Sequence, residues 1–530
     1  MLRCHTHGPG CNCCGAVDRR GFLEKCGVAV LGACGSLGAL AARASEKNQA
    51  ETRVAAVFLR SMDTREIWPY PGFDCKTRQR ELLSRLQQSC PGIRFIPVAV
   101  ENASDMHKAI ALKDSVDGYL VYTMTLVWRH RSDIVSIAQL GKPMVVADEF
   151  LGGSGVFLTG YSQIFDRGIP AVAVSTRRFS DLVLVARQFA SVRAATTTPA
   201  SFAKHCEKVY RGTFGRAARS KCLRDTVELT DIQECVERFR RSRFLIIGRG
   251  HGGQEHDFLG AKGRYADFEE LQSLYNEVDR DEAAAWAERW SKQAQQLPPG
   301  NYIEPSQPRP DAVRRAGALY LAMLKLLKKY ETDSITINCL SGFTAGKLPA
   351  YPCLGFMQIL NDGGQGVCEA MPDDTISMLM ARILTGRPGF VSDPALDTSK
   401  NQIVYAHCVG TTKVFGPDGT SNGYRIRTLH NRDPRGAAVE SLMPAGYMTT
   451  SFRTNFARKK MVIHQAKAIG PLETEKGCRT KLLAEVRGDI GKLFNKWSQF
   501  GWHRVTVYGD VKEPLVEFAK ALGLSIVEEA

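Results

Sequence analysis

The stretch PCLGFMQILNDGGQGVCEAMPDDTISMLMARILTGRPGFVSD, residues 352–393, lies where the pattern of the chain changes. A helical segment at 354–360 leads through a glycine turn to a short strand that ends at Cys368 and Glu369. A second helical segment, 373–384, leads to a strand that we expect to end at Asp393. Strands and helices alternate before this stretch, and short strands follow it, so the fold changes class here.

Upstream, apolar runs of four to six residues alternate with helical segments from Arg53 onward. The helix expected at 75–90 has Leu82, Leu83 and Leu86 on one face. The runs expected to be strands are RVAAVFLR, RFIPVAV, GYLVYTM, KPMVVADEF and IPAVAVS. Continuous apolar strands between helices indicate a parallel sheet covered on both faces, so we predict an α/β domain at 53–178.

A second α/β domain is predicted at 181–387, with strands in RFLIIGRGHGG and SITINCL and a long helical region at 267–296. Glycines follow the first of these strands, and such a loop either cradles an anion or lines a cleft. The second reading is favoured because no helix signal follows at once. Gly250 and His251 are therefore candidate substrate-binding cleft residues.

Beyond Pro388 short alternating strands are separated by Gly, Pro, Asn and Asp, and a helix and a last strand close the chain. We predict a β-rich domain at 388–530. The expected fold is α/β: two N-terminal Rossmann-like domains with parallel sheets, then an antiparallel, β-barrel-like C-terminal domain.

Residues 1–44 have the order of an export signal. Arg19 and Arg20 precede an apolar run and then ARAS, as in a twin-arginine signal cleaved after Ala44. Alternatively, LGAC is a lipoprotein signal with Cys34 lipidated. We expect a periplasmic protein without a transmembrane span after signal removal, or a cytoplasmic one if the signal is not used. The initial Cys/His cluster then leaves with the signal or, in a retained protein, binds metal.

The composition is that of a globular protein of two to four domains, with 530 residues, 44% hydrophobic and 24% charged. The net charge of +15 is spread along the chain without zinc-finger or aromatic-basic motifs, which argues against a nucleic-acid partner. Ten of the 16 cysteines lie outside the signal and form no close pair, as expected for buried thiols.

Several motifs in the C-terminal third occur together: the Cys368-Glu369 turn, LTGRP after the next helix, AHC with His407, and HRVTVYGD beginning at His503. In this order they resemble the L-fucose isomerase and L-arabinose isomerase superfamily, whose architecture the two α/β domains match more loosely. The resemblance implies an aldose–ketose isomerase for a pentose or 6-deoxyhexose. It also implies a homo-oligomer, trimeric or hexameric.

The resemblance further implies a divalent metal, usually Mn²⁺, bound by Glu369, Asp393 and His503. His407 stands where the arabinose branch adds a histidine, as a ligand or an outer residue. Asp373 and Asp374 match no family ligand and fit the first turn of a helix, where carboxylates favour the dipole. Cys368 and Cys408 flank the ligands and should point away from the metal, because neighbouring strand residues face opposite ways.

Isomerisation of an open-chain sugar moves a proton between C1 and C2. A divalent ion acidifies that proton, and two carboxylates, Glu369 and Asp393, serve as the acid/base pair. Oxygen-rich ligands with an imidazole suit Mn²⁺, Mg²⁺ or Co²⁺.

An alternative is an exported, non-catalytic sugar-binding or sensing protein on the same scaffold. The export signal favours it, as does Met371, where many relatives carry an acidic residue. Each candidate also has a purely structural reading: Glu369 as a helix cap, Asp393 as a turn residue, and His407 and His503 as strand histidines.

Overall fold

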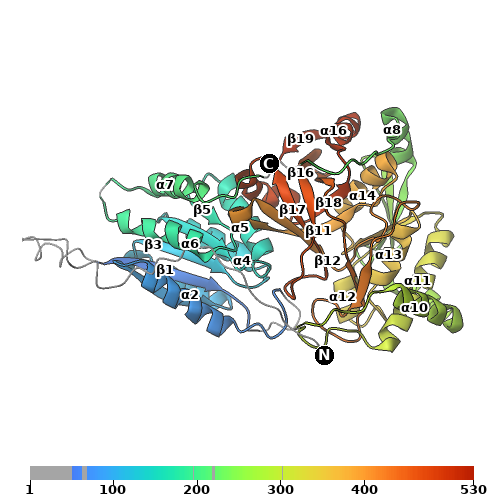
Figure 1. The fold of residues 1–530 in the computed structure, drawn as a ribbon, viewed down its shortest axis with the longest axis horizontal. Coiled ribbons are helices and arrows are strands. Elements are labelled where there is room, and N and C mark those ends of the chain that lie inside the picture. The colour runs from blue at the N-terminus through green and yellow to red at the C-terminus, as the bar shows by residue number, and fades with distance from the viewer. Residues whose placement is uncertain (1–50, 63–67, 195, 218–220, 301) are drawn as a thin grey trace, which may run out of the picture. The chain divides into compact units, whose positions relative to one another are not determined.

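Three large β-sheets follow one another along the chain in the computed structural model (Figure 1). The structure describes residues 51–62, 68–194, 196–217, 221–300 and 302–530. The predicted signal at 1–44 lies outside these residues.

The first sheet is parallel, with strand order β2-β1-β3-β4-β5. Its strands are β1 (Thr52–Leu59), β2 (Ile93–Val100), β3 (Gly118–Thr123), β4 (Met144–Asp148) and β5 (Val172–Val174). Its helices are α2 (Cys75–Ser89), α3 (Ala103–Ala111), α4 (His130–Ala138), α5 (Ser154–Asp166), α6 (Phe179–Ala186) and α7 (Pro199–Arg211). Helix α2 packs against α6, whereas α3 packs against α4 and α4 against α5. This is the doubly wound arrangement that continuous apolar strands predict.

The second sheet, of order β10-β9-β6-β8-β7, is parallel except for its antiparallel edge strand β7. Its strands are β6 (Arg243–Ile247), β7 (Glu255–Phe258), β8 (Ala261–Ala266), β9 (Ser334–Ile337) and β10 (Gln365–Cys368). The helices of this part are α8 (Ile232–Arg241), α9 (Phe268–Asn276), α10 (Arg280–Gln293), α11 (Pro310–Lys329), α12 (Cys339–Thr344), α13 (Cys353–Asn361) and α14 (Pro372–Thr385). Most strand residues are buried, as expected below a layer of helices.

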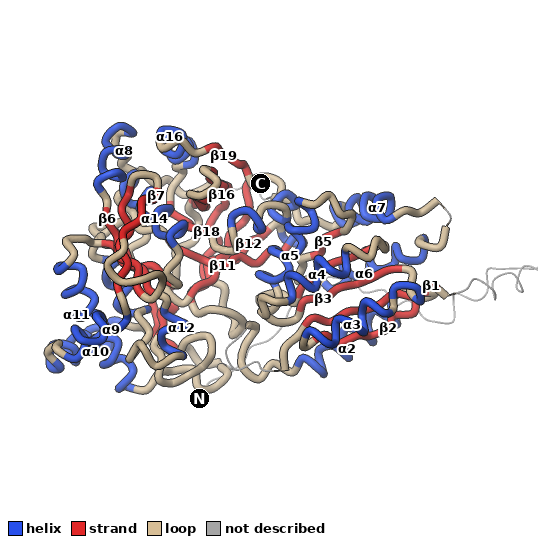
Figure 2. The backbone as a smooth tube through the Cα atoms, turned by 180° about the vertical axis from the view of Figure 1, so that it is seen from behind, coloured by secondary structure: helices blue, strands red, loops and turns tan. Residues whose placement is uncertain are grey.

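The third sheet closes on itself. Its order is β15-β18-β11-β12-β17-β16-β19, and β15 also pairs with β16, so six antiparallel strands form a ring. The strands are β11 (Phe390–Asp397), β12 (Gln402–His407), β15 (Met448–Asn455), β16 (Lys460–Pro471), β17 (Thr480–Arg487), β18 (Arg504–Tyr508) and β19 (Ser525–Glu528). A hairpin of β13 (Tyr424–Arg427) and β14 (Ala438–Ser441) and helices α15 (Trp497–Phe500) and α16 (Lys512–Ala521) complete this part. Figure 2 shows β11, β12 and β18 close together near its centre.

The predicted fold class is confirmed: a parallel α/β N-terminal part and an antiparallel, barrel-like C-terminal part. The predicted domain boundaries stay predictions. Within the described parts of the chain, every helix is too short or too polar to cross a membrane.

One predicted region is subdivided, and one local expectation was wrong. The helical region 267–296 is two helices, because Asp279 caps α10 by accepting hydrogen bonds from the backbone of Asp281 and Glu282. The strand expected to end at Asp393 continues to Asp397. Pro394 lies within this strand, where its carbonyl accepts a hydrogen bond from the Trp502 indole.

Candidate metal centre

Three neighbouring strands of the barrel bring Asp393, His407 and His503 to the same level. Asp393 of β11 pairs with Ala406 of β12, and His407 is the next residue. On the other side of β11, Ser392 pairs with Arg504 of β18, and His503 is the residue before it. The antiparallel register therefore gathers residues that are far apart in the sequence.

Glu369 reaches these residues from the second sheet. It follows β10 directly and begins a turn in which Glu369 and Ala370 both have left-handed backbone conformations, with φ of 69° and 49°. Non-glycine residues avoid this region, and such strain is concentrated at functional sites. The turn ends at Pro372, the first residue of α14. The side chain of Glu369 is 31% exposed, which makes it the solvent-facing member of the group.

The side chains converge within a few ångströms. Oε1 of Glu369 lies 3.7 Å from Nε2 of His407, and Oε2 lies 3.6 Å from Nε2 of His503. Single ligand atoms of these three residues all lie within 4.8 Å of one another. Oδ1 of Asp393 lies 3.1 Å from Nε2 of His503, so Asp393 joins the group through that histidine.

The second ring nitrogen of His503 is held by a buried carboxylate. Nδ1 of His503 lies 2.5 Å from Oδ2 of Asp374, and Oδ1 of Asp374 pairs with Arg453. Burial opposes the charge of His503, but Asp374 and Asp393 outweigh it and raise the pKa of the imidazole well above its usual value. Although burial raises the pKa of Asp374, Arg453 and His503 together hold it well below the ordinary range. The pair orients Nε2 of His503 toward Glu369 and Asp393.

Two buried polar atoms in this group, Nδ1 and Nε2 of His407, lack a hydrogen-bond partner. Buried polar groups are normally satisfied, so these atoms call for an explanation. A divalent cation fits: it takes carboxylate and imidazole ligands, and adjacent ligand atoms around a small octahedral ion lie about 3 Å apart. The Asp393–His503 separation of 3.1 Å has that size. The residues present therefore suit a metal ion.

The structure brings together four of the residues predicted from the sequence: Glu369, Asp393, His407 and His503. Their catalytic and metal-binding roles stay predictions. Gly250 and His251 lie in an exposed loop after β6. Within the described ranges, no hydrogen bond or ion pair links that loop to the Glu369 group.

Asp374 is the residue that sequence reasoning missed. It lies in the first turn of α14, as predicted, but it is completely buried rather than solvated. The signal that was available is the apolar run TISMLM directly after it, which indicates a helix start with little solvent around it.

Two curated sugar isomerases are similar to part of the chain. No family model matches the chain. It is 26% identical over 208 residues to sulfoquinovose isomerase from Priestia aryabhattai and to sulfoquinovose isomerase from Priestia megaterium. The match covers 38% of this chain and 45% of each relative, so the chain spans less than half the length of the curated relatives it matches. At this coarse level, the chain is similar to sugar isomerases.

Proposed function

We propose that the protein is a metal-dependent aldose–ketose isomerase. The observation that carries this proposal is the convergence of Glu369, Asp393, His407 and His503, with buried polar atoms that lack hydrogen bonds. The similarity to sulfoquinovose isomerases supports the same reaction class.

Each residue has a role in this proposal. Glu369, Asp393 and His503 would hold the ion, with His407 as a further ligand, and the donor set favours Mn²⁺ over thiophilic metals. When bound, a divalent cation acidifies the C–H bond beside the sugar carbonyl and stabilises the charge that develops there. Glu369 is the more accessible carboxylate and takes the proton from one carbon; Asp393, with its side chain 8% exposed, is the second member of the acid/base pair.

The sugar is proposed from resemblance. A pentose or 6-deoxyhexose follows from the fucose/arabinose motifs, and sulfoquinovose follows from the name of the relatives. Export to the periplasm and assembly into a trimer or hexamer are parts of the proposal that rest on the sequence alone.

The test is an isomerase assay on metal-depleted full-length protein with and without added Mn²⁺. The panel contains aldopentoses, 6-deoxyhexoses and sulfoquinovose. We expect Mn²⁺-dependent conversion of at least one sugar, and a loss of at least about 10³-fold in Glu369→Gln, because that variant lacks a ligand and an acid/base group. Glu517→Gln on the exposed face of α16 is the matched control and should keep full activity.

Conversion that survives metal removal or the Glu369→Gln change would refute the proposal. Metal-independent binding of a sugar without conversion would favour a non-catalytic sugar-binding protein. Met371, which is partly exposed two residues after Glu369, is the position to examine in that case.

A further inference from the structure

A second group of metal-type side chains lies at the other face of β12. Cys408 follows β12, Cys478 precedes β17, and His430 follows the hairpin strand β13. Because His407 of β12 pairs with Thr480 of β17, both cysteines lie at the same end of this strand pair. Both are buried, and His430 is partly exposed.

The distances within this group have the size expected around a tetrahedral ion. Nδ1 of His430 lies 3.4 Å from Sγ of Cys408 and 3.6 Å from Sγ of Cys478, and the three atoms lie within 4.8 Å of one another. Zinc binds sulfur at about 2.3 Å and imidazole nitrogen at about 2.0–2.1 Å, which places S and N ligands about 3.6 Å apart.

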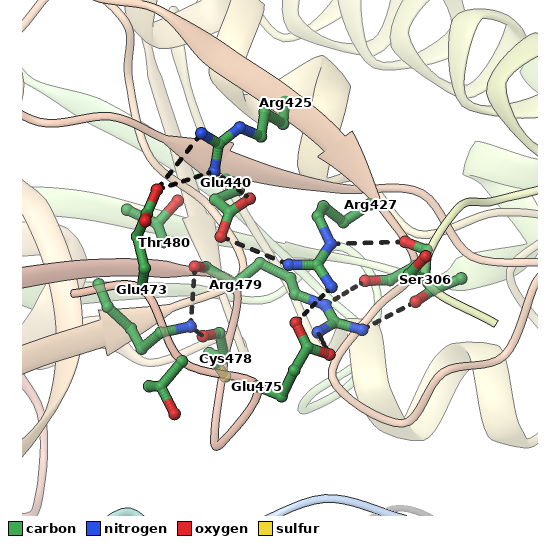
Figure 3. Close-up of polar contacts among 12 residues, drawn as sticks. Ser306, Arg425, Arg427, Glu440, Glu473, Glu475, Cys478, Arg479 and Thr480 are labelled. Atoms are coloured by element: carbon green, nitrogen blue, oxygen red, sulfur yellow. Dashed lines mark hydrogen bonds and ion pairs between the residues drawn. The ribbon is translucent and has the colours of Figure 1, made fainter. Parts of the chain in front are cut away.

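A buried network fixes the backbone around these ligands (Figure 3). Nζ of Lys481 donates to the Cys478 carbonyl at 2.7 Å. Arg479, drawn in the middle of Figure 3, donates from Nε to the Thr428 carbonyl at 2.7 Å and from Nη2 to the Leu429 carbonyl at 3.1 Å. The segment that carries Cys478 is therefore tied to the segment that leads to His430.

The same network supplies positive charge. Arg479 and Lys481 are 1% and 2% exposed and lie one and three residues after Cys478 in the chain. We propose that Cys408, His430 and Cys478 form a second metal site that binds a thiophilic divalent ion of the zinc type and joins β12, β17 and the segment after β13.

This site is chemically distinct from the Glu369 group. His407 and Cys408 are neighbours in the chain, so one strand end would carry an oxygen-rich site for a hard ion and a thiolate site for a softer one. With three protein ligands and a partly exposed histidine, the fourth position is left for water. The proposal does not depend on isomerase activity.

Cobalt substitution tests the proposal in the full-length chain. Co²⁺ bound by thiolates gives an intense near-ultraviolet sulfur-to-cobalt charge-transfer band, whereas Co²⁺ bound only by oxygen and nitrogen does not. We expect the band in the wild-type protein and in Glu369→Gln. We expect Cys478→Ser and Cys408→Ser to lose it, and Cys206→Ser, at a buried cysteine of α7, to keep it. The comparison of variants is needed because six more cysteines lie in residues 1–44.

A second variant and a second measurement keep the test decisive if the cysteine variants do not fold. His430→Asn changes a partly exposed side chain, and it should lower Zn²⁺ affinity at least about tenfold, since losing even a residue that supports a ligand costs about that much. Mass mapping of the wild-type protein should find Cys408 and Cys478 as thiols. Three results would overturn the proposal: no charge-transfer band, a band that Cys408→Ser, Cys478→Ser and His430→Asn leave intact, or a Cys408–Cys478 disulfide in the purified protein.

Discussion

His503 shows how single residues prepare the candidate centre. Its Nδ1 is engaged by Asp374, so its Nε2 is the atom left to face Glu369 and Asp393. A carboxylate behind a ligating histidine fixes the ring and raises its basicity. Asp374 thus acts through His503, as a positioning residue.

The first prediction concerns Asp374→Asn. The variant should bind Mn²⁺ about 10–100-fold more weakly than the wild type, because the His503 ring loses its charged partner. Titration of metal-free protein with Mn²⁺, followed by electron paramagnetic resonance, measures the change. Asp373→Asn is the matched control, since the hydrogen bond that the Asp373 carboxylate accepts among the described residues comes from the Phe456 backbone. Equal affinity in both variants would remove Asp374 from the centre.

At the scale of single residues, most of the candidate site was predicted from short sequence motifs. Glu369, Asp393 and His503 are recognisable because each lies in a short motif with distinctive neighbours. Asp374 is different, since its burial depends on Arg453, 79 residues further along the chain. The Cys408–His430–Cys478 group was missed for a similar reason: its members are 22 and 48 residues apart, and only the β12–β17 pairing brings the cysteines together.

Among the elements, β17 shows where pattern reasoning stops. Its sequence, TKLLAEVR, contains good helix formers and no β-branched run, so it gives a weak strand signal. In the barrel it pairs with β12 and β16, and tertiary pairing overrides its local preference. By contrast, β1, β3 and β4 were predictable because their apolar runs are continuous.

Helix α14 gives the second prediction. It ends at Gly386, which has a left-handed φ of 66° and open space where a side-chain methyl group would lie. Gly386→Ala should therefore lower the free energy of unfolding by about 1 kcal/mol through backbone strain alone. Gly300→Ala is the control, because Gly300 has only ordinary contacts and no positive φ, and it should be neutral. Urea unfolding measures both, and a neutral Gly386→Ala would contradict the assigned cap.

Trp502 is the element-level link between the first sheet and the barrel. Its ring packs against Trp68 and Trp128, and a methyl group added at Gly155 of α5 would lie 2.6 Å from it. Gly155→Ala should therefore destabilise the protein by about 1–3 kcal/mol. It should also reduce activity, because Trp502 precedes His503. Thermal unfolding and the isomerase assay test this, and an unchanged melting temperature would contradict the tight packing.

At the scale of the whole molecule, a buried network of charged side chains near the C-terminus makes the stability of the fold depend on pH. Glu529 pairs with Arg504 and lies 2.9 Å from Nδ1 of His464, whose Nε2 contacts the Tyr405 hydroxyl at 2.6 Å. Burial opposes ionisation of Glu529, but Arg504 and His464 outweigh it and lower its pKa from 4.5 to about 2. A folded-state pKa below the unfolded value stabilises the protein above about pH 4.5, and this contribution is lost as the pH falls toward 2.

The fourth prediction follows from the lowered pKa of Glu529. Glu529→Gln should be less stable than the wild type at pH 7 by about 3–5 kcal/mol, because it leaves Arg504 buried without its partner. The difference should shrink as the pH falls from 5 toward 2, where the wild type also loses the charge. Denaturant unfolding at a series of pH values measures it. A difference that stays constant over this range would contradict the assigned pKa.

The order of the three parts was predictable from the sequence, because strands of a parallel sheet read as continuous apolar runs and strands of an antiparallel barrel alternate between apolar and polar residues. Closure of the barrel was not, since it depends on the β15–β16 pairing and on the central place of β17. The candidate centre depends on the order of the parts and on the closure of the barrel. Glu369, which follows β10, lies close to His407 of β12 and His503 before β18, and His503 lies close to Asp393 of β11.

The most direct test is anomalous diffraction at the manganese absorption edge from crystals grown with Mn²⁺. We predict one strong peak among Glu369, Asp393 and His503, and its loss in crystals of Glu369→Gln. A well-ordered wild-type site without a peak, at saturating Mn²⁺ and neutral pH, would contradict the central claim that these side chains form a metal centre.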